Sequence, residues 1–137
     1  MSLKKSRIAA VVAVSDMNRA REFYEGKLGL ELADQSMPND LLYQCLGSTE
    51  LVIYLSPEHA GKSSATVAGW EVDDLDLEMD VLISRGVVFE HYDEPGLKTD
   101  SRGVAELNGS KLAWFKDPEG NTFSLSQEYP TSRSRKL

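Results

Sequence analysis

Residues Val14–Gly29 read VSDMNRAREFYEGKLG, and residues Val72–Gly86 repeat the same plan as VDDLDLEMDVLISRG. Each segment follows a run of β-forming residues and opens with an acidic residue that can cap a helix. Each segment also ends at a glycine, the residue type that most often terminates a helix. A chain that builds the same strand–turn–helix unit twice is expected to fold as two similar halves, with a ligand site in the cleft between them.

The first half predicts the element order β-α-β-β-β. Ile8–Val14 is a short valine-rich run typical of a strand. The helix that follows Asp16 has an apolar stripe at helical spacing, formed by Met17, Ala20, Phe23, Tyr24 and Leu28. Three further strands are predicted, with a loop before the second and a hairpin turn before the third: Leu30–Ala33, the loop Met37-Pro38-Asn39-Asp40, Leu41–Leu46, the turn Gly47-Ser48-Thr49, and Glu50–Leu55.

The second half predicts the same order after a linker at Ser56–Ser64. Asp73 or Asp74 caps the helix, whose buried stripe is Leu75, Met79 and Leu82. The predicted strands are Ala65–Val72, Val87–His91, Lys111–Lys116 and Thr122–Gln127, the last two flanking the turn Asp117-Pro118-Glu119-Gly120-Asn121. Tyr92–Arg102 is predicted to be a polar loop, which covers the cleft or lies on the surface, and Val104–Leu107 fits either a loop or a strand.

The predicted domain organisation is therefore a tail at 1–6, a βαβββ module at 7–55, the linker at 56–64, a second βαβββ module at 65–128 and a tail at 129–137. The fold class is α+β, with a curved mixed sheet around a cleft.

The composition excludes several classes of protein. The 137-residue chain carries a formal net charge of −7, which argues against nucleic-acid binding because phosphate contacts need a basic surface. Its one basic cluster, Arg133-Ser134-Arg135-Lys136, fits a solvated tail. The apolar run Ile8–Val14 is too short for a membrane span or a signal core, and the single cysteine, Cys45, fits a reducing compartment. We expect a cytoplasmic protein without nucleic-acid or membrane partners.

Alternation along the strands predicts one face of unusually small side chains. Ala9, Val11 and Ala13 share a face of the first strand, opposite Val12 and Val14. On the fifth and last strands, Trp70, Phe123 and Leu125 are predicted to face the helix. The opposite face of these two strands carries Val67, Gly69, Glu71, Thr122, Ser124 and Ser126. A densely packed core face would not combine such small residues, so a ligand, water or a second subunit is expected there.

Three motifs in this order resemble the vicinal oxygen chelate superfamily, the group of glyoxalases, bleomycin resistance proteins and extradiol dioxygenases. They are Val14-Ser15-Asp16 with Ala20–Tyr24 and Leu28-Gly29-Leu30, then Trp70–Leu75, then Trp114–Asn121. The resemblance covers almost all of Arg7–Gln127. It implies paired βαβββ modules around a cleft, often completed by dimerisation, so a homodimer is expected.

Metal-dependent members of the superfamily place His, Gln or Glu at one position on each of four strands. The resemblance carries these positions to Ala9, Tyr54, Val67 and Ser124. Ala and Val have no donor atom, neutral Ser is a poor ligand, and Tyr is an uncommon one for divalent ions. We therefore expect no metal and no cofactor.

The remaining candidates for chemistry each have a plainer interpretation. Glu71 is the best catalytic candidate because it shares the small-residue face, although a solvated strand-end acid is the simpler role; the same applies more strongly to Glu50. His59 and His91 are expected to be exposed or edge residues, and Cys45 to be an inert buried thiol. Tyr54 offers a ring and a hydroxyl for binding a planar molecule. Parity predicts that Trp70 packs under the helix, whereas Trp114 cannot be assigned to a face.

We therefore expect a metal-free protein that binds a small apolar or aromatic molecule through Tyr54, Val67, Gly69, Glu71 and Ser124. Two alternatives stay open at this point. One is an enzyme of the superfamily, such as a lyase, isomerase or dioxygenase. The other is a structural or regulatory dimer whose own side chains fill the cleft.

Overall fold

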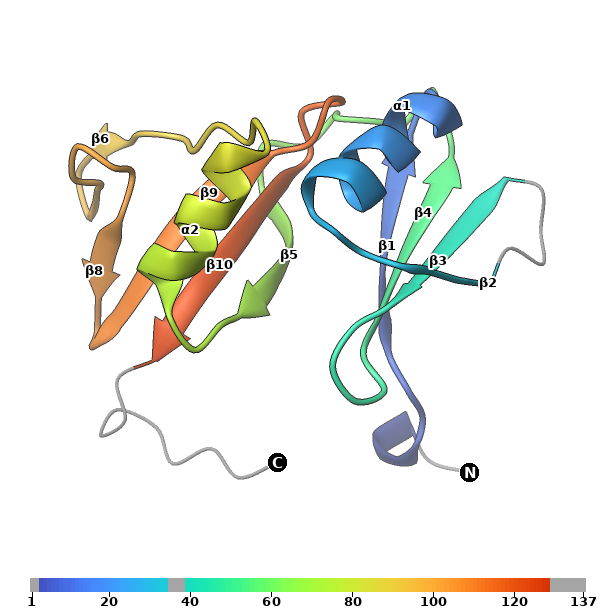
Figure 1. Cartoon of the computed structure of the whole chain (residues 1–137), viewed down its shortest axis with the longest axis horizontal. Helices are drawn as coiled ribbons and strands as arrows, with labels where there is room; N and C mark the ends of the chain where they lie inside the picture. The colour runs from blue at the N-terminus through green and yellow to red at the C-terminus, as the bar shows by residue number, and fades with distance from the viewer. Residues whose placement is uncertain (1–2, 35–38, 129–137) are drawn as a thin grey trace. The chain divides into compact units, whose positions relative to one another are not determined.

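A computed structural model describes residues 3–34 and 39–128 of the chain (Figure 1). The chain divides into two units. The first comprises Met1–Val67 and Asp117–Asn121, and the second comprises Ala68–Lys116 and Thr122–Leu137. The predicted Met37-Pro38 part of the first loop and the basic cluster at 133–136 lie outside the described residues. No helix among the described residues is long and apolar enough to cross a membrane.

The first unit contains a four-stranded sheet in the order β1-β4-β3-β2. Its strands are β1 (Ala9–Val14), β2 (Leu32–Asp34), β3 (Asp40–Gln44) and β4 (Glu50–Leu55). β1 and β4 run parallel, whereas β3 pairs antiparallel with both β4 and β2. A short 3-10 helix, η1 (Leu3–Lys5), precedes the sheet. The predicted β-α-β-β-β order is confirmed, but Ile8 lies before the first strand and is 86% exposed.

The first helix is interrupted where the sequence predicts a continuous one. Asp16 caps α1 (Met17–Arg21) by accepting a hydrogen bond from the Arg19 backbone N–H. The chain then continues as the π-helix η2 (Glu22–Lys27). Ala20, Phe23 and Tyr24 are buried, and Gly29 takes a φ of 75° beyond the helix, the left-handed conformation that glycine adopts most readily.

The core of the first unit lies on one face of its sheet. By alternation, Val12, Val14, Leu51 and Ile53 share this face, and Leu41 and Tyr43 extend it on β3. Figure 1 shows α1 and η2 across this sheet. The opposite face carries Ala9, Val11 and Ala13, as alternation predicts.

The second unit contains a four-stranded sheet in the order β5-β10-β9-β8 and one helix. Its strands are β5 (Thr66–Glu71), β8 (Ala105–Leu107), β9 (Ser110–Lys116) and β10 (Thr122–Glu128). Asp74 caps α2 (Leu75–Ser84), which lies across this sheet in Figure 1. Its predicted stripe of Leu75, Met79 and Leu82 is buried.

Aromatic rings fill the space between α2 and the sheet. Trp70 lies with its ring centroid 5.5 Å from that of Phe123, and Phe115 lies 5.7 Å from Phe123. Phe89 meets Phe115 edge to face at 5.8 Å. Parity therefore placed Trp70 correctly on the sheet face that carries Phe115 and Phe123, although Trp70 itself is half-buried rather than in the core.

One strand predicted for the second half is absent. Val87–His91 forms no strand; only Phe89 makes a β-bridge, to Phe115, and the Glu90 N–H donates to the Trp114 carbonyl. The outer edge of β9 is covered by two separate pieces of chain, Phe89–Glu90 at one end and β8 at the other. Val104–Leu107, left open between loop and strand, contributes β8 through its last three residues.

The predicted polar loop Tyr92–Arg102 contains a small hairpin, formed by β6 (Asp93–Glu94) and β7 (Leu97–Lys98). Pro95 and Gly96 occupy its turn, and Gly96 has a φ of 81°. Proline followed by a left-handed glycine is the signature of a type II turn.

Candidate ligand-binding surfaces

The first unit has a half-exposed apolar surface on the face of its sheet opposite the helices. Parallel pairing of β1 with β4 places Val11 opposite Val52 and Ala13 opposite Tyr54. Val11 is 60% exposed, which is high for a valine within a strand. Tyr54 is half-buried and pairs with Asp40 on the neighbouring strand β3. This surface, called the Tyr54 surface below, offers aliphatic area and one phenol.

The second unit has a corresponding surface of small residues on β5 and β10. Gly69 lies so close to β10 that a Cβ at this position would overlap with the Ser124 hydroxyl oxygen. Any larger side chain would therefore have to displace Ser124, so glycine keeps the backbone of β5 accessible at this point. The structure brings Gly69 and Ser124 together, as the sequence predicts.

Trp114 completes this surface, and the sequence could not assign its orientation. Antiparallel pairing places Trp114 directly opposite Ser124, so the two side chains share the face that points away from α2. Trp114 is only 9% exposed, and the ring of Tyr92 meets it edge to face, with centroids 5.5 Å apart. We call Gly69, Ser124, Trp114 and Tyr92 the Trp114 surface.

The hairpin at 93–98 holds Tyr92 in place. The Tyr92 N–H donates to the Thr99 hydroxyl at 2.8 Å, and the Thr99 N–H donates to the Tyr92 carbonyl at 3.0 Å. Burial, and then the nearby Glu90 and Glu94, raise the pKa of the Tyr92 phenol, so it stays a neutral hydrogen-bond donor. No sequence pattern predicted the contact, because a residue at a loop base has no periodicity to place its side chain.

The remaining predicted site residues are spread along the strands. Val67 and Glu71 share the Gly69 face of β5 by alternation, and both are exposed. In the first unit Ala9 faces Glu50, whereas Tyr54 faces Ala13, four positions further along the same ladder. At about 3.3 Å per residue, Ala9 and Tyr54 are too far apart to bind one ion together.

The two histidines each lie within hydrogen-bond distance of a polar group of a nearby residue. The Nδ1 atom of exposed His59 is 2.9 Å from the Ser56 hydroxyl. The Nε2 atom of His91, also exposed, is 3.1 Å from the Ser101 carbonyl oxygen. Cys45 is half-buried, rather than buried as the sequence suggested.

Within the described residues, no three His, Cys, Asp or Glu side chains are grouped so that they could hold a metal ion. The Trp114 surface itself supplies hydroxyl, indole and phenol groups. These are ordinary groups for contacting an organic molecule and weak ligands for a divalent ion.

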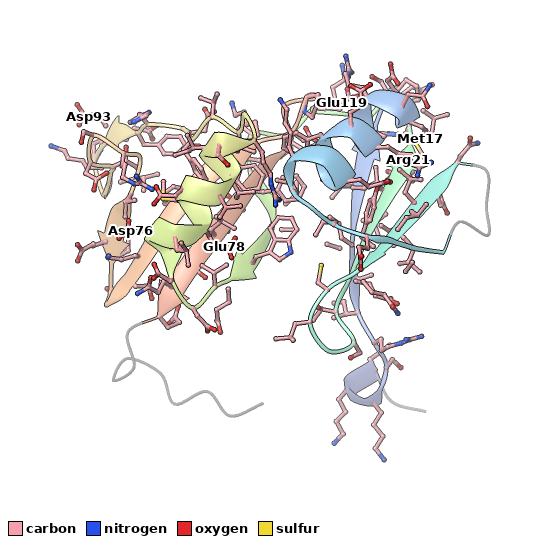
Figure 2. All side chains as sticks on the ribbon, in the orientation of Figure 1. Met17, Arg21, Asp76, Glu78, Asp93 and Glu119 are labelled. Atoms are coloured by element: carbon pink, nitrogen blue, oxygen red, sulfur yellow. The ribbon has the colours of Figure 1, made fainter. Side chains whose placement is uncertain are left out.

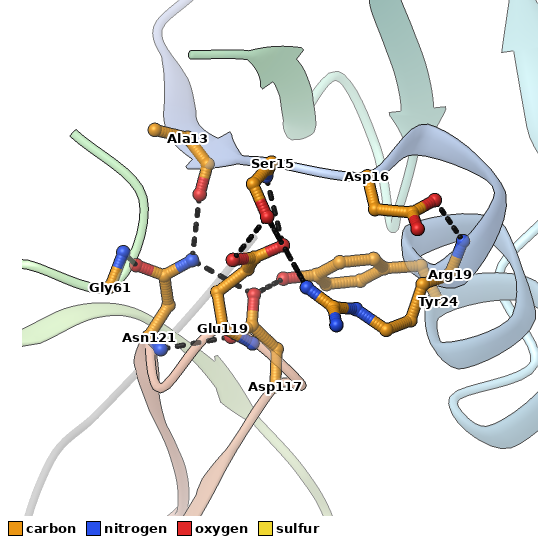
Figure 3. Close-up of polar contacts among 9 residues, drawn as sticks. All are labelled: Ala13, Ser15, Asp16, Arg19, Tyr24, Gly61, Asp117, Glu119 and Asn121. Atoms are coloured by element: carbon orange, nitrogen blue, oxygen red, sulfur yellow. Dashed lines mark hydrogen bonds and ion pairs between the residues drawn. The ribbon is translucent and has the colours of Figure 1, made fainter. Parts of the chain in front are cut away.

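A buried polar network organises the turn Asp117–Asn121 within the first unit (Figure 3). The buried Asp117 carboxylate accepts hydrogen bonds from the Tyr24 hydroxyl at 2.6 Å and from the Asn121 side-chain amide at 2.9 Å. The Asn121 amide also donates to the Ala13 carbonyl at 2.9 Å. These contacts hold the turn beside β1 and η2, which is a structural role.

Glu119 forms the outer part of the same network (Figure 3). Its carboxylate accepts from the Ser15 backbone N–H, the Ser15 hydroxyl and the Arg19 guanidinium, each at 2.8 Å. Burial alone would raise the pKa of Glu119, but these hydrogen bonds outweigh it and lower the pKa. With its charge paired in this way, Glu119 also acts as a structural group.

Charged residues on α2 form a further cluster, on the side of the second unit where Figure 2 shows Asp76 and Glu78. The Arg102 guanidinium donates to the Asp80 carboxylate at 2.8 Å and to the Asp76 carbonyl at 3.2 Å. The Lys111 ammonium lies 3.5 Å from Asp76. These exposed contacts tie the chain around Arg102 and the start of β9 to the helix.

A family model described as Glyoxalase/Bleomycin resistance protein/Dioxygenase superfamily matches residues 7–125. No curated protein matches the chain.

Several solved structures are similar over almost their whole length. An antibiotic binding protein, TnmS3, from Streptomyces sp. CB03234 is 27% identical, with a TM-score of 0.69 and coverage of 91% of this chain and 97% of that one. A glyoxalase/bleomycin resistance protein from the same organism is 28% identical, with a TM-score of 0.64 and coverage of 89% and 100%. A glyoxalase/bleomycin resistance protein from Catenulispora acidiphila is 25% identical, with a TM-score of 0.66 and coverage of 90% and 98%.

Proposed function

The chain belongs to the glyoxalase/bleomycin resistance protein/dioxygenase superfamily, and on that premise we propose that it binds a small apolar or aromatic molecule without using a metal ion. The observation that carries the proposal is the Trp114 surface. There a glycine, a serine hydroxyl and two aromatic rings lie together on the sheet face that α2 does not cover.

The chemistry of this surface favours a flat organic molecule. Gly69 leaves the backbone of β5 uncovered, so a planar group can approach it closely. The half-buried ring of Tyr92 and the small exposed part of Trp114 add apolar area with fixed geometry. Ser124, which pairs with Trp114, provides a hydrogen-bonding group beside them. A few polar groups within an apolar surface are typical of sites that bind small molecules.

The similarity to TnmS3 supports this proposal, because that protein is an antibiotic binding protein and its identity with the present chain is 27%. Glu71 and Val67, on the same face of β5 as Gly69, are proposed to add further contacts. Tyr54 is proposed as a ligand-contacting residue on the Tyr54 surface. Glu71 remains the best candidate for a proton acceptor should a reaction take place.

Tryptophan fluorescence tests the proposal, because the chain has two tryptophans on opposite faces of one sheet. The variant Trp70→Phe leaves Trp114 as the single reporter. We expect saturable quenching of Trp114 by anilinonaphthalene sulfonate and by metal-free bleomycin or another aromatic antibiotic. The variant Gly69→Leu is expected to weaken it.

The matched control is Leu77→Ala on the exposed face of α2, where leucine is 59% exposed. It should bind each probe as tightly as the parent. If no probe in the panel quenches Trp114, or if Gly69→Leu and Leu77→Ala behave alike, the Trp114 surface is not the binding site.

Elemental analysis tests the metal-free part of the proposal. Protein purified without chelators should contain far less than one divalent ion per chain, and dialysis against a chelator should leave probe binding unchanged. One tightly bound ion per chain would instead favour the metal-dependent enzymes of the superfamily.

We further propose that the chain is a homodimer, in line with the partners expected from the sequence. Sedimentation equilibrium measures this directly, and a monomer at micromolar concentration would contradict it.

A further inference from the structure

Thr122 is a buried residue whose hydroxyl has no hydrogen-bond partner within the described chain. It is 2% exposed, and its Oγ1 atom is the one side-chain polar atom in the described residues that is both fully buried and unpaired. Such a group loses its hydrogen bonds with water on folding and gains none in return, which is unfavourable. The group is therefore suited to a partner that the chain itself does not supply.

The position of Thr122 on β10 shows which surface it belongs to. Thr122 and Ser124 are two residues apart on one strand, so their side chains share a face, while Phe123 between them packs toward α2. Thr122 pairs with Lys116 and Ser124 pairs with Trp114. Thr122 is therefore a diagonal neighbour of Trp114 on this face, a separation that an aromatic ring can span.

We infer that Thr122 is a specificity-determining residue that hydrogen-bonds a polar substituent on the edge of an aromatic ligand. This inference rests on the proposed function and narrows it. An aromatic ring that lies against Trp114 would bring a hydroxyl or carbonyl group on its edge toward the buried Thr122 oxygen. The ligand class is a flat aromatic compound with at least one hydroxyl or carbonyl group, rather than a plain hydrocarbon.

A buried polar group discriminates between ligands in this way because only one of them can satisfy it. A ligand that hydrogen-bonds Thr122 gains affinity, whereas a hydrocarbon of the same shape leaves the hydroxyl unpaired. One hydrogen bond of ordinary strength corresponds to a preference of about three- to tenfold.

The test compares naphthalene with naphthol by equilibrium dialysis, because the two probes share a ring system and differ by one hydroxyl. We expect the protein to bind naphthol about three- to tenfold more tightly. Thr122→Val keeps the shape of the side chain and removes the hydroxyl, so it should bind the two probes equally. Retention of the naphthol preference in Thr122→Val would overturn the inference and leave the proposed function standing.

Thr49→Val is the matched control. The Thr49 hydroxyl donates to the Leu46 carbonyl at 2.6 Å in the turn between β3 and β4. This variant should keep the naphthol preference and have a lower Tm, whereas Thr122→Val should melt at the same temperature or higher. A clear fall in the Tm of Thr122→Val would show that the chain itself pairs the hydroxyl, which contradicts the inference. If the parent protein binds neither probe, the proposed function fails, and this inference fails with it.

Discussion

The hydrogen bond from Tyr24 to Asp117 is expected to be a large single polar contribution to the stability of the first unit. The variant Tyr24→Phe removes one hydroxyl and leaves the ring in place. Tyr24 is fully buried and its hydroxyl donates at 2.6 Å to a carboxylate that is itself buried. A hydrogen bond to a charged group contributes about 1.5–3 kcal/mol, and burial favours the upper part of that range.

The partner groups support this magnitude. The Asp117 carboxylate also accepts from the backbone N–H groups of Glu119 and Asn121, at 3.0 and 2.8 Å, so it is held rigidly and cannot turn toward water. Burial, together with Asp117, raises the pKa of Tyr24, so the phenol remains a donor across the range in which the protein is folded. We therefore expect Tyr24→Phe to lower the free energy of unfolding by about 2–3 kcal/mol.

Tyr43→Phe is the matched control, because Tyr43 is equally buried and also donates to a carboxylate. Its hydroxyl lies 2.8 Å from Glu25, whose side chain is 28% exposed and also accepts from Arg21. Because the Glu25 carboxylate is partly exposed, water can replace the lost hydroxyl, whereas the Asp117 carboxylate is only 5% exposed. A loss of about 0.5–1 kcal/mol is therefore expected for Tyr43→Phe.

Urea unfolding at neutral pH, followed by circular dichroism, measures both variants. The m-value should not change, because the surface exposed on unfolding is the same. The reasoning is refuted if Tyr24→Phe lowers the free energy of unfolding no more than Tyr43→Phe does. The burial of the Asp117 carboxylate would then add nothing to the strength of the hydrogen bond.

Three further predictions concern close backbone approach and pH. Gly69→Ala should lower the free energy of unfolding by about 1–3 kcal/mol, because the new methyl group collides with the Ser124 hydroxyl; in the background of Ser124→Ala, urea unfolding should show a smaller loss, and an equal loss would exclude this collision as the cause. Gly61→Ala should lower the free energy of unfolding more than Gly69→Ala does. Gly61 has a φ of +65°, and a Cβ at this position would overlap with the backbone carbonyl of Glu119, which cannot rotate away. A melting temperature close to that of the parent would contradict this. The pKa of Glu119 is lowered in the folded protein. Its contribution to stability is therefore present above the ordinary Glu pKa of about 4.3 and is lost as pH falls through the pKa of the folded protein. Glu119→Gln should lose less stability than the parent between about pH 5 and pH 3, and parallel curves of unfolding free energy against pH would show that Arg19 and Ser15 do not hold the carboxylate.

Local patterns in the sequence predicted the elements whose causes are local. Asp16 and Asp74 cap helices because their side chains accept hydrogen bonds from backbone N–H groups three residues on. The stripe of Leu75, Met79 and Leu82 is buried because helical spacing places the three on one side.

Elements with non-local causes were misplaced. The sequence of Val87–His91 does not show that only Phe89 bridges to Phe115. The pairing depends on β9, whose edge is shared between Phe89 and β8. The switch from α1 to the π-helix η2 was also missed. It accompanies contacts of Tyr24 and Glu25 with Asp117 and Tyr43, which lie far away in the sequence.

The candidate site also has a part that the sequence predicted and a part that it did not. Alternation alone places Gly69 and Ser124 on one face, because side chains on a strand point to opposite sides in turn. The orientation of Trp114, its contact with Tyr92 and the unpaired Thr122 hydroxyl depend on the register between β9 and β10 and on the course of the loop after Phe89.

The sequence by itself therefore determined the repeated β-α-β-β-β plan and the small residues on one face of each sheet. Both follow from the intrinsic geometry of helices and strands. Only the tertiary structure decided which aromatic and hydroxyl groups lie beside those small residues. Strand register and loop conformation are set by packing between distant segments, which no local pattern encodes.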